Sequence, residues 1–107
     1  MTVPASRYVT ALWEARAREG KEPAMRTFMR DTVTATRHDP GCLDYEAHEV
    51  EGQPGTFIVW ERWESPDALA AHQQTPRMQA LITQVLPMMA GTFEEGVRLL
   101  RPLRPAH

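Results

Sequence analysis

The sequence predicts an α+β fold in which helices cover one face of a four-stranded antiparallel sheet. Two observations support this: four segments alternate apolar and other residues with a period of two, and the segments between them carry apolar stripes at helical spacing. Strands are expected at residues 8–18, 42–49, 56–63 and 93–100. With helices after the first and third of these, the order β-α-β-β-α-β is the split βαβ arrangement of ferredoxin-like topology.

The first strand and first helix follow from residue spacing. One face of the strand is expected to carry Val9, Ala11, Trp13 and Ala15, and the other Tyr8, Thr10, Leu12 and Glu14. Pro23 suits the first turn of a helix, and the residues that then fall on one helical stripe are Met25, Phe28, Met29, Thr32, Val33 and Thr36. Pro40 disfavours helical backbone at Asp39, so the helix is expected to end near His38.

The middle of the chain predicts a hairpin. In 42–49, Leu43, Tyr45 and Ala47 alternate with polar residues, and 56–63 is a second alternating run. The turn-forming segment 51–55 between them is short, which favours antiparallel pairing. The two runs should therefore be neighbours in the sheet.

The second helical region begins at Ser65-Pro66-Asp67, which supplies an N-cap, a first-turn proline and a first-turn acid for a helix over 66–74. Thr75-Pro76 repeats this start. The stripe of the helix that follows is Met78, Leu81, Ile82, Val85, Leu86 and Met89, with a kink or an end near Pro87. After Gly91 a last strand is expected around 93–100, and 101–107 is expected to be a tail outside the single domain at 1–100.

Composition excludes several classes of protein. The 107 residues suffice for one core, 42% are hydrophobic and the net charge is −2, with acids and bases interspersed. No basic face for a nucleic acid is expected, and no segment approaches the apolar length of a membrane span. A single cysteine, Cys42, and the absence of a signal-like start favour a reducing compartment, the cytoplasm.

The face of the sheet away from the helices is expected to be apolar. Tyr8, Leu12, Ile58 and Trp60 should lie on it. A contiguous aromatic and aliphatic patch is rarely left exposed on a monomer, so the sequence predicts a homodimer that pairs these faces. The alternative is that Trp60 and Tyr8 lie at an edge beneath the tail.

No strong catalytic motif is present, and the four histidines lack metal-ligand spacing, so no metal is expected. Alternation places Glu61 on the same strand face as Trp63, among apolar neighbours, and His72 can point back at the sheet from the following helix. Glu61 and His72 are therefore a candidate acid–base pair. The alternative is structural: His72 bound to a backbone carbonyl and Glu61 to an arginine.

Three segments carry a family resemblance: residues 39–45, 57–63 and 68–76. Together they resemble the antibiotic biosynthesis monooxygenase family. The resemblance implies a dimeric α/β-barrel assembly of ferredoxin-like units with a pocket between helices and sheet, and oxidation of phenols or quinols without metal or flavin cofactors. By position, Glu61, Trp63 and His72 match the family's acid, aromatic residue and helix histidine, and Tyr45 matches an aromatic residue of the second strand.

The haem-degrading branch of the family fits this chain poorly. The resemblance would require an asparagine in the first strand and a histidine in the last helix, but the chain contains no asparagine, and Trp13 and Ile82 occupy those places. The leading hypothesis is a cofactor-independent monooxygenase that uses O2 on a small aromatic quinol or phenol. His72 and Glu61 would be catalytic, and Trp63, Trp13 and Tyr45 would bind the ring. An isomerase or tautomerase of a small carbonyl compound, or a non-catalytic ligand-binding dimer, are the alternatives.

Overall fold

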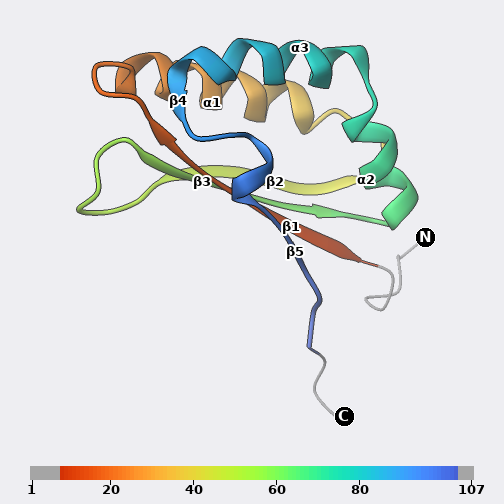
Figure 1. Cartoon of the computed structure of the whole chain (residues 1–107). Coiled ribbons are helices and arrows are strands. Elements are labelled where there is room, and N and C mark those ends of the chain that lie inside the picture. The colour runs from red at the N-terminus through yellow and green to blue at the C-terminus, as the bar shows by residue number, and fades with distance from the viewer. Residues whose placement is uncertain (1–7, 104–107) are drawn as a thin grey trace.

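The computed structural model describes residues 8–103 and has the predicted α+β architecture. The strands are β1 (Val9–Ala17), β2 (Cys42–Glu49), β3 (Thr56–Trp63), β4 (Met89–Ala90) and β5 (Val97–Leu100). The helices are α1 (Glu22–Thr36), α2 (Pro66–Gln73) and α3 (Pro76–Val85). All three helices lie on one side of the sheet, and the other side is left open (Figure 1).

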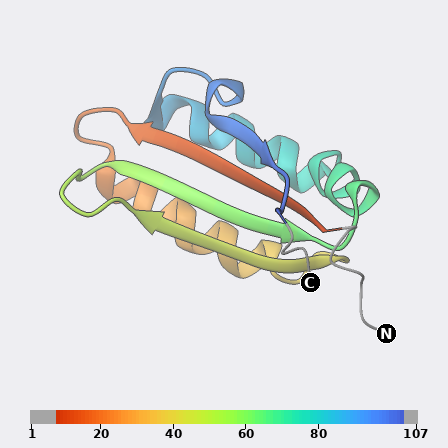
Figure 2. The ribbon, with the colours of Figure 1, turned by 90° about the horizontal axis from the view of Figure 1, so that it is seen from below.

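The sheet is antiparallel, with strands in the order β2-β3-β1-β4 and with β5 also paired to β1 (Figure 2). Trp13 of β1 lies opposite Val59 of β3, and Tyr45 of β2 lies opposite Glu61 of β3. The odd-numbered residues of β3 are buried beneath the helices, as the alternation predicts, and so are those of β1 from Ala11 to Ala17, whereas Val9 is half-buried. This register places Glu61 and Trp63 in the interior.

The last strand differs from the prediction. Instead of one strand over 93–100, β4 and β5 follow one another along the same edge of β1, separated by a loop over residues 91–96 that includes a 3-10 turn, Glu94–Gly96. Trp13 holds this loop, because its Nε1 donates to the Phe93 carbonyl at 3.1 Å and its ring contacts the Phe93 ring. A Cβ on Gly96 would lie 2.0 Å from the Glu14 carbonyl oxygen, so only glycine allows this close approach.

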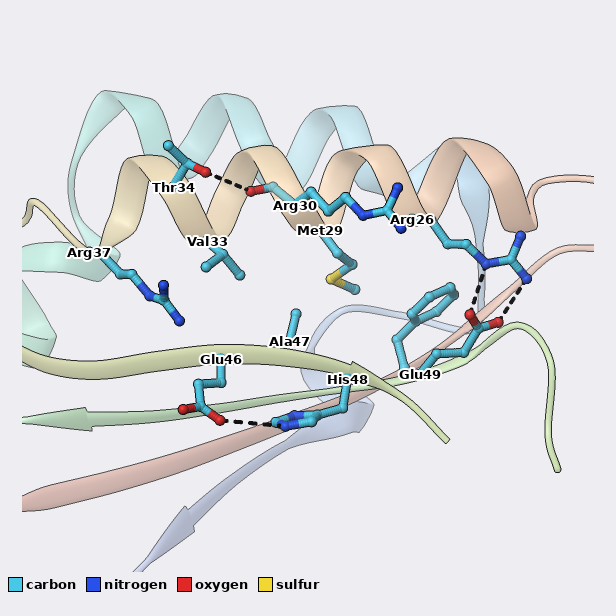
Figure 3. A pocket seen from close by; sticks show the side chains of 11 residues that line it. Arg26, Met29, Arg30, Val33, Thr34, Arg37, Glu46, Ala47, His48 and Glu49 are labelled. Atoms are coloured by element: carbon cyan, nitrogen blue, oxygen red, sulfur yellow. Dashed lines mark hydrogen bonds and ion pairs between the residues drawn. The ribbon is translucent and has the colours of Figure 1, made fainter. Parts of the chain in front are cut away.

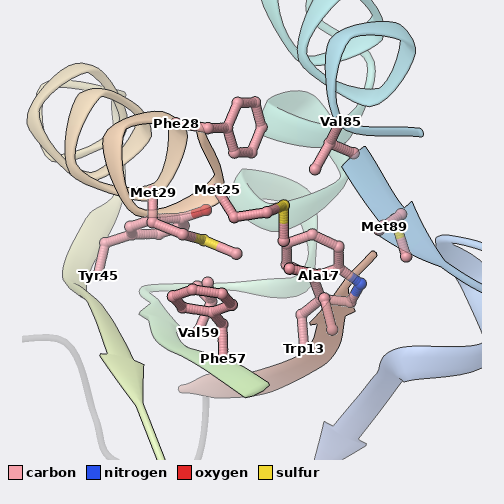
Figure 4. Packing of buried hydrophobic residues seen from close by; sticks show 11 residues of the cluster. Trp13, Ala17, Met25, Phe28, Met29, Tyr45, Phe57, Val59, Val85 and Met89 are labelled. Carbon is pink, nitrogen blue, oxygen red and sulfur yellow. The ribbon is translucent and has the colours of Figure 1, made fainter. Parts of the chain in front are cut away.

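The core fills the layer between α1, α3 and the sheet. Phe28 and Met25 of α1 and Val85 of α3 face Phe57, Val59 and Trp13 of the sheet (Figure 4). In β2, a bulge between Cys42 and Asp44 leaves Leu43 exposed, and Cys42 packs against the core instead. The extra residue of a bulge reverses the alternation locally, which is why Leu43 does not share the buried face of Tyr45 that the regular alternation predicts.

Both helices that follow β3 start as predicted. Ser65 Oγ accepts from the Ala68 amide and Thr75 Oγ1 from the Met78 amide, each at 3.1 Å. Such caps accept hydrogen bonds from backbone N–H groups of the first turn, which have no acceptor within the helix. α3 ends at Val85, two residues before Pro87, near which a kink or an end is predicted, and the chain continues as a 3-10 turn, Leu86–Met88.

Two predicted features concern the ends of the chain and the membrane. The tail predicted at 101–107 has no regular structure over residues 101–103, and its remaining residues lie outside those described. Within residues 8–103, every helix is too short or too polar to span a bilayer.

Candidate functional site

A cavity of about 560 Å³ lies between the sheet and the helices α2 and α3, and we call it the outer cavity. Gln73, Glu94 and Leu99 at its border are exposed to solvent, so small molecules can reach it. Its lining is largely apolar and includes Trp13, Glu61, His72, Met78, Ile82, Phe93 and Val97. Met78, Leu81 and Ile82 of α3 are only half-buried because that part of the stripe faces cavities rather than packed side chains.

His72 is the one imidazole on this lining. It lies near the end of α2 with 4% of its surface exposed, and its Nδ1 lies 2.8 Å from Asp39 Oδ2. An ionised carboxylate only accepts hydrogen bonds, so Nδ1 carries the proton and Nε2 presents a lone pair. No residue within 8–103 hydrogen-bonds to Nε2, and that atom is not sealed off by its neighbours. Among the described residues, the ring is therefore fixed through Nδ1 and has no hydrogen-bond partner at Nε2.

Asp39 reaches His72 from the turn between α1 and β2. The turn lies directly against α2: a Cβ on Gly41 would lie 2.6 Å from Ala68 Cβ, and Gly41 has a φ of +81° that also favours glycine. Arg77, at the start of α3, donates from Nη2 to the same Oδ2 atom of Asp39. This ion pair holds the carboxylate in place beside the imidazole.

Glu61 does not orient His72, so the predicted acid–imidazole pair is wrong in its contact. Trp63 Nε1 donates to Glu61 Oε1 at 2.8 Å, and the Trp63 ring stacks on the imidazole with centroids 4.5 Å apart. Glu61 therefore reaches His72 only through the indole. Both Glu61 and His72 nevertheless line the outer cavity, so the two residues share one solvent-reachable space.

The three aromatic residues predicted to hold a ring lie in three different places. Trp13 lines the outer cavity, whereas Tyr45 lines only a smaller space beneath it, which we call the inner chamber. Trp63 is fully buried and lines neither space, so its predicted contact with substrate is wrong. The Trp63 indole can be buried because its N–H donates a hydrogen bond to Glu61. The indole ring stacks on the imidazole of His72 and helps to hold it in place.

Burial shifts the protonation of the site residues. Desolvation lowers the pKa of His72 below its usual value, against the opposing effect of Asp39, so the ring is neutral at pH 7. Desolvation raises the pKa of Glu61, partly offset by the hydrogen bond from Trp63. Burial also raises the pKa of Cys42 to about 11, which keeps it a thiol. The neutral imidazole is thus the available base.

Sequence reasoning missed Asp39 and Arg77. The sequence predicts for Asp39 a place outside the helix, because Pro40 follows it, and a place in the segment 39–45 that carries the family resemblance, but no contact with His72, and it predicts no role for Arg77. The available signal was a carboxylate at a turn shortly before a core strand, together with a buried histidine that needs a partner. Within the described residues, no three His, Cys, Asp or Glu side chains come together as a set of metal ligands.

A second groove, of about 560 Å³, lies between α1 and the edge strand β2 (Figure 3). It holds Arg26, Arg30 and Arg37, but Arg26 is paired with Glu49 at 2.8 Å and Arg37 donates to the Tyr45 carbonyl. The hydrogen bond from Arg26 lowers the pKa of Glu49 to about 2. The groove is open to solvent, and its histidine, His48, lies exposed beside Glu46. The groove therefore has no buried imidazole comparable to His72 in the outer cavity.

Comparison with known proteins identifies the family of this chain. Residues 8–84 match the family model described as "Antibiotic biosynthesis monooxygenase". A Mycobacterium tuberculosis protein named "Putative monooxygenase Rv0793" is 30% identical over 83 residues, which cover 78% of this chain and 79% of that protein. A Synechocystis protein, sll1783, is 29% identical over 62 residues, which span 58% of this chain and 42% of that protein.

Solved structures agree with the fold. The structure of Rv0793 aligns with a TM-score of 0.82 and 26% identity over 94% of this chain and 99% of that one. PA3566 from Pseudomonas aeruginosa aligns with a TM-score of 0.83 at 23% identity, over 94% and 99% of the two chains. The family model covers residues 8–84, most of the chain. The chain belongs to the antibiotic biosynthesis monooxygenase family.

Proposed function

We propose that the protein is a cofactor-independent monooxygenase that oxidises a small quinol or phenol with O2. The observation that supports it best is the free Nε2 of His72, a neutral imidazole held by Asp39 on the wall of a largely apolar cavity. A base of this kind can remove a phenolic proton at neutral pH. The family and the name of the mycobacterial relative agree with an oxidative reaction.

Deprotonation is the step that the protein has to assist. A neutral phenol gives up an electron reluctantly, whereas its phenolate is a far better reductant and can pass one electron to O2. Nε2 of His72 takes the proton, and the resulting imidazolium is stabilised by the Asp39 carboxylate 2.8 Å from Nδ1. General-base assistance of this kind is typically worth about 10²–10⁴-fold in rate.

The remaining steps balance without another reductant. The substrate radical and superoxide combine at a ring carbon that bears hydrogen, forming a C–O bond, and the imidazolium returns its proton to the peroxide. Loss of water then removes the ring hydrogen and cleaves the O–O bond, leaving a carbonyl. For a phenol the sum is substrate plus O2 to quinone plus water, in which the ring loses four electrons and O2 gains them.

The cavity lining suits a small aromatic ring. Trp13 and Phe93 lie with ring centroids 4.9 Å apart at one wall, and Ile82 and Met78 of α3 form another. Apolar walls exclude water and favour stacking or edge contacts with a planar substrate. Trp13 is therefore proposed as the ring-binding aromatic residue of the outer cavity.

The proposal is tested by oxygen consumption of the purified protein with a panel of hydroquinones and phenols, with no metal or flavin added. One O2 consumed per quinone formed, with one oxygen atom added to the ring and no hydrogen peroxide released, at a rate above the buffer rate, supports it. Turnover of a carbonyl compound without oxygen consumption would instead support an isomerase. Ligand-dependent thermal stabilisation without any product would support a binding protein.

We also propose that two copies pair through the open faces of their sheets. Tyr8, Leu12, Ile58 and Trp60 are each half-buried on that face, and the Arg62 guanidinium lies over the rings of Tyr8 and Trp60. Ile58→Lys places a charge at the centre of this face and is expected to give a monomer by light scattering or sedimentation. The same change at exposed Leu86, Leu86→Lys, is the control and should leave the dimer intact. Dimeric Ile58→Lys protein would contradict the proposed interface.

A further inference from the structure

The inner chamber adjoins the outer cavity and is much smaller, about 30 Å³. The two spaces share the side chains of Trp13, Glu61, Met78, Ile82 and Phe93 in their walls. Phe28 and Tyr45, which line only the chamber, belong to the layer between α1 and the sheet in Figure 4. A volume of about 10–15 Å³ suffices for one water, so the chamber has room for one or two small atoms and excludes a ring.

Thr32 is the unusual residue of this chamber. It lies on the buried stripe of α1 with 6% of its surface exposed, and it lines the chamber. Its Oγ1 is the only fully enclosed side-chain nitrogen or oxygen, within residues 8–103, that lacks a hydrogen-bond partner. A buried hydroxyl without a partner is unfavourable, so this position calls for a group that can accept or donate a hydrogen bond.

Glu61 adds a second polar group to the same wall. One of its oxygens, Oε1, accepts from Trp63, and no residue within 8–103 is bonded to Oε2. Because Glu61 lines both spaces, its carboxyl group lies where the outer cavity meets the chamber. The other chamber side chains are almost all apolar, so these two groups set the polarity of what enters.

We infer that the inner chamber is a subsite for one oxygen-bearing substituent of the substrate, a ring hydroxyl or carbonyl, which hydrogen-bonds to Thr32 Oγ1 and to the Glu61 carboxyl group. This rests on the proposed function and specifies its substrate class: rings with two oxygens, one at His72 in the outer cavity and the other in the chamber. Met78, unbranched and flexible, lines both spaces and can yield to the entering group.

The size and polarity of the chamber together favour this class. An apolar substituent would fill the space but leave the Thr32 hydroxyl unpaired, and a larger polar group such as a carboxylate exceeds the volume. A single oxygen satisfies both limits. Sites built to hydrogen-bond a substrate oxygen discriminate strongly against analogues that lack it.

The test compares the binding of two ligands in the absence of O2: 1,4-dihydroxynaphthalene, which carries two hydroxyl groups on its ring system, and 1-naphthol, which carries one. Thr32→Val keeps the shape of the side chain and removes the hydroxyl. We expect it to weaken binding of 1,4-dihydroxynaphthalene about tenfold, as Kd, and to change that of 1-naphthol less than about twofold. Thr32→Ser should retain the affinity. Thr34→Val, on the exposed side of the same helix, is the matched control.

Equal weakening for both ligands, no effect on either, or no binding of either ligand to the wild type would overturn the subsite. Binding and turnover separate its failure from that of the proposed function. If the expected difference in Kd is found but no O2 is consumed, the subsite stands and the monooxygenase proposal fails. If O2 is consumed and Thr32→Val leaves the affinity for the two-oxygen ligand unchanged, the subsite fails alone.

Discussion

Replacing His72 by alanine is expected to lower kcat/KM for oxidation of a phenol or quinol by about 10²–10⁴-fold, the usual contribution of a general base. The variant removes the only imidazole on the outer cavity among the described residues and leaves the Asp39–Arg77 ion pair in place. Initial rates of oxygen consumption at saturating and limiting substrate measure the effect. The loss should fall mainly on kcat, because the proton is transferred in the transition state.

His48→Ala is the matched control for this result. His48 is exposed on β2 beside Glu46, in the second groove, and should be replaceable with less than about a twofold change in rate. Circular dichroism and thermal unfolding of both variants establish that each is folded. If His72→Ala oxidises every substrate as fast as the wild type, His72 is not the base.

Asp39→Asn is expected to lower kcat/KM by about 10–100-fold, the equivalent of a lost charge-assisted hydrogen bond. The substitution keeps the shape of the side chain but removes the charge that stabilises the imidazolium. The pH profile should change as well. In the wild type, kcat/KM falls as the pH drops through the pKa of His72, which burial lowers below its ordinary value of about 6.5. Because Asp39 opposes that lowering, its loss should move the midpoint to still lower pH.

Asp44→Asn is the control for Asp39. Asp44 pairs with Arg62 on β2 and β3, away from the outer cavity, and the same chemical change there should alter neither the rate nor the midpoint. A shift of the Asp39→Asn midpoint to higher pH would contradict the assigned role, since it would mean that Asp39 lowers the pKa of His72 in the wild type.

The fold was largely predictable because its determinants are local. The period-two alternation of β3 places Phe57, Val59, Glu61 and Trp63 under the helices, and all four are buried. Ser65-Pro66 and Thr75-Pro76 begin α2 and α3 through side-chain caps that need only neighbouring residues. The interruption of the last strand was not predictable, since it depends on Trp13, some 80 residues earlier, binding the Phe93 carbonyl.

The candidate site was predictable only in part. Alternation and helix phase bring Glu61 and His72 to one cavity, because both residues lie on elements with regular geometry. Their partners depend on long-range docking. Asp39 contacts His72 only because the turn at Gly41 lies against Ala68. The spacing of residues along the chain does not predict that contact. Glu61 bonds to Trp63 because a residue two positions along the same strand face is the nearer donor.

The most direct measurement is the protonation state of the His72 ring, from nitrogen chemical shifts of the histidine-labelled protein across pH 5–8. The mechanism depends on an imidazole whose Nδ1 hydrogen is bound to Asp39 and whose Nε2 is unprotonated and free. At pH 7 we predict the neutral form with hydrogen on Nδ1. A ring with hydrogen on Nε2, or one that is doubly protonated at pH 7, would contradict the proposed base.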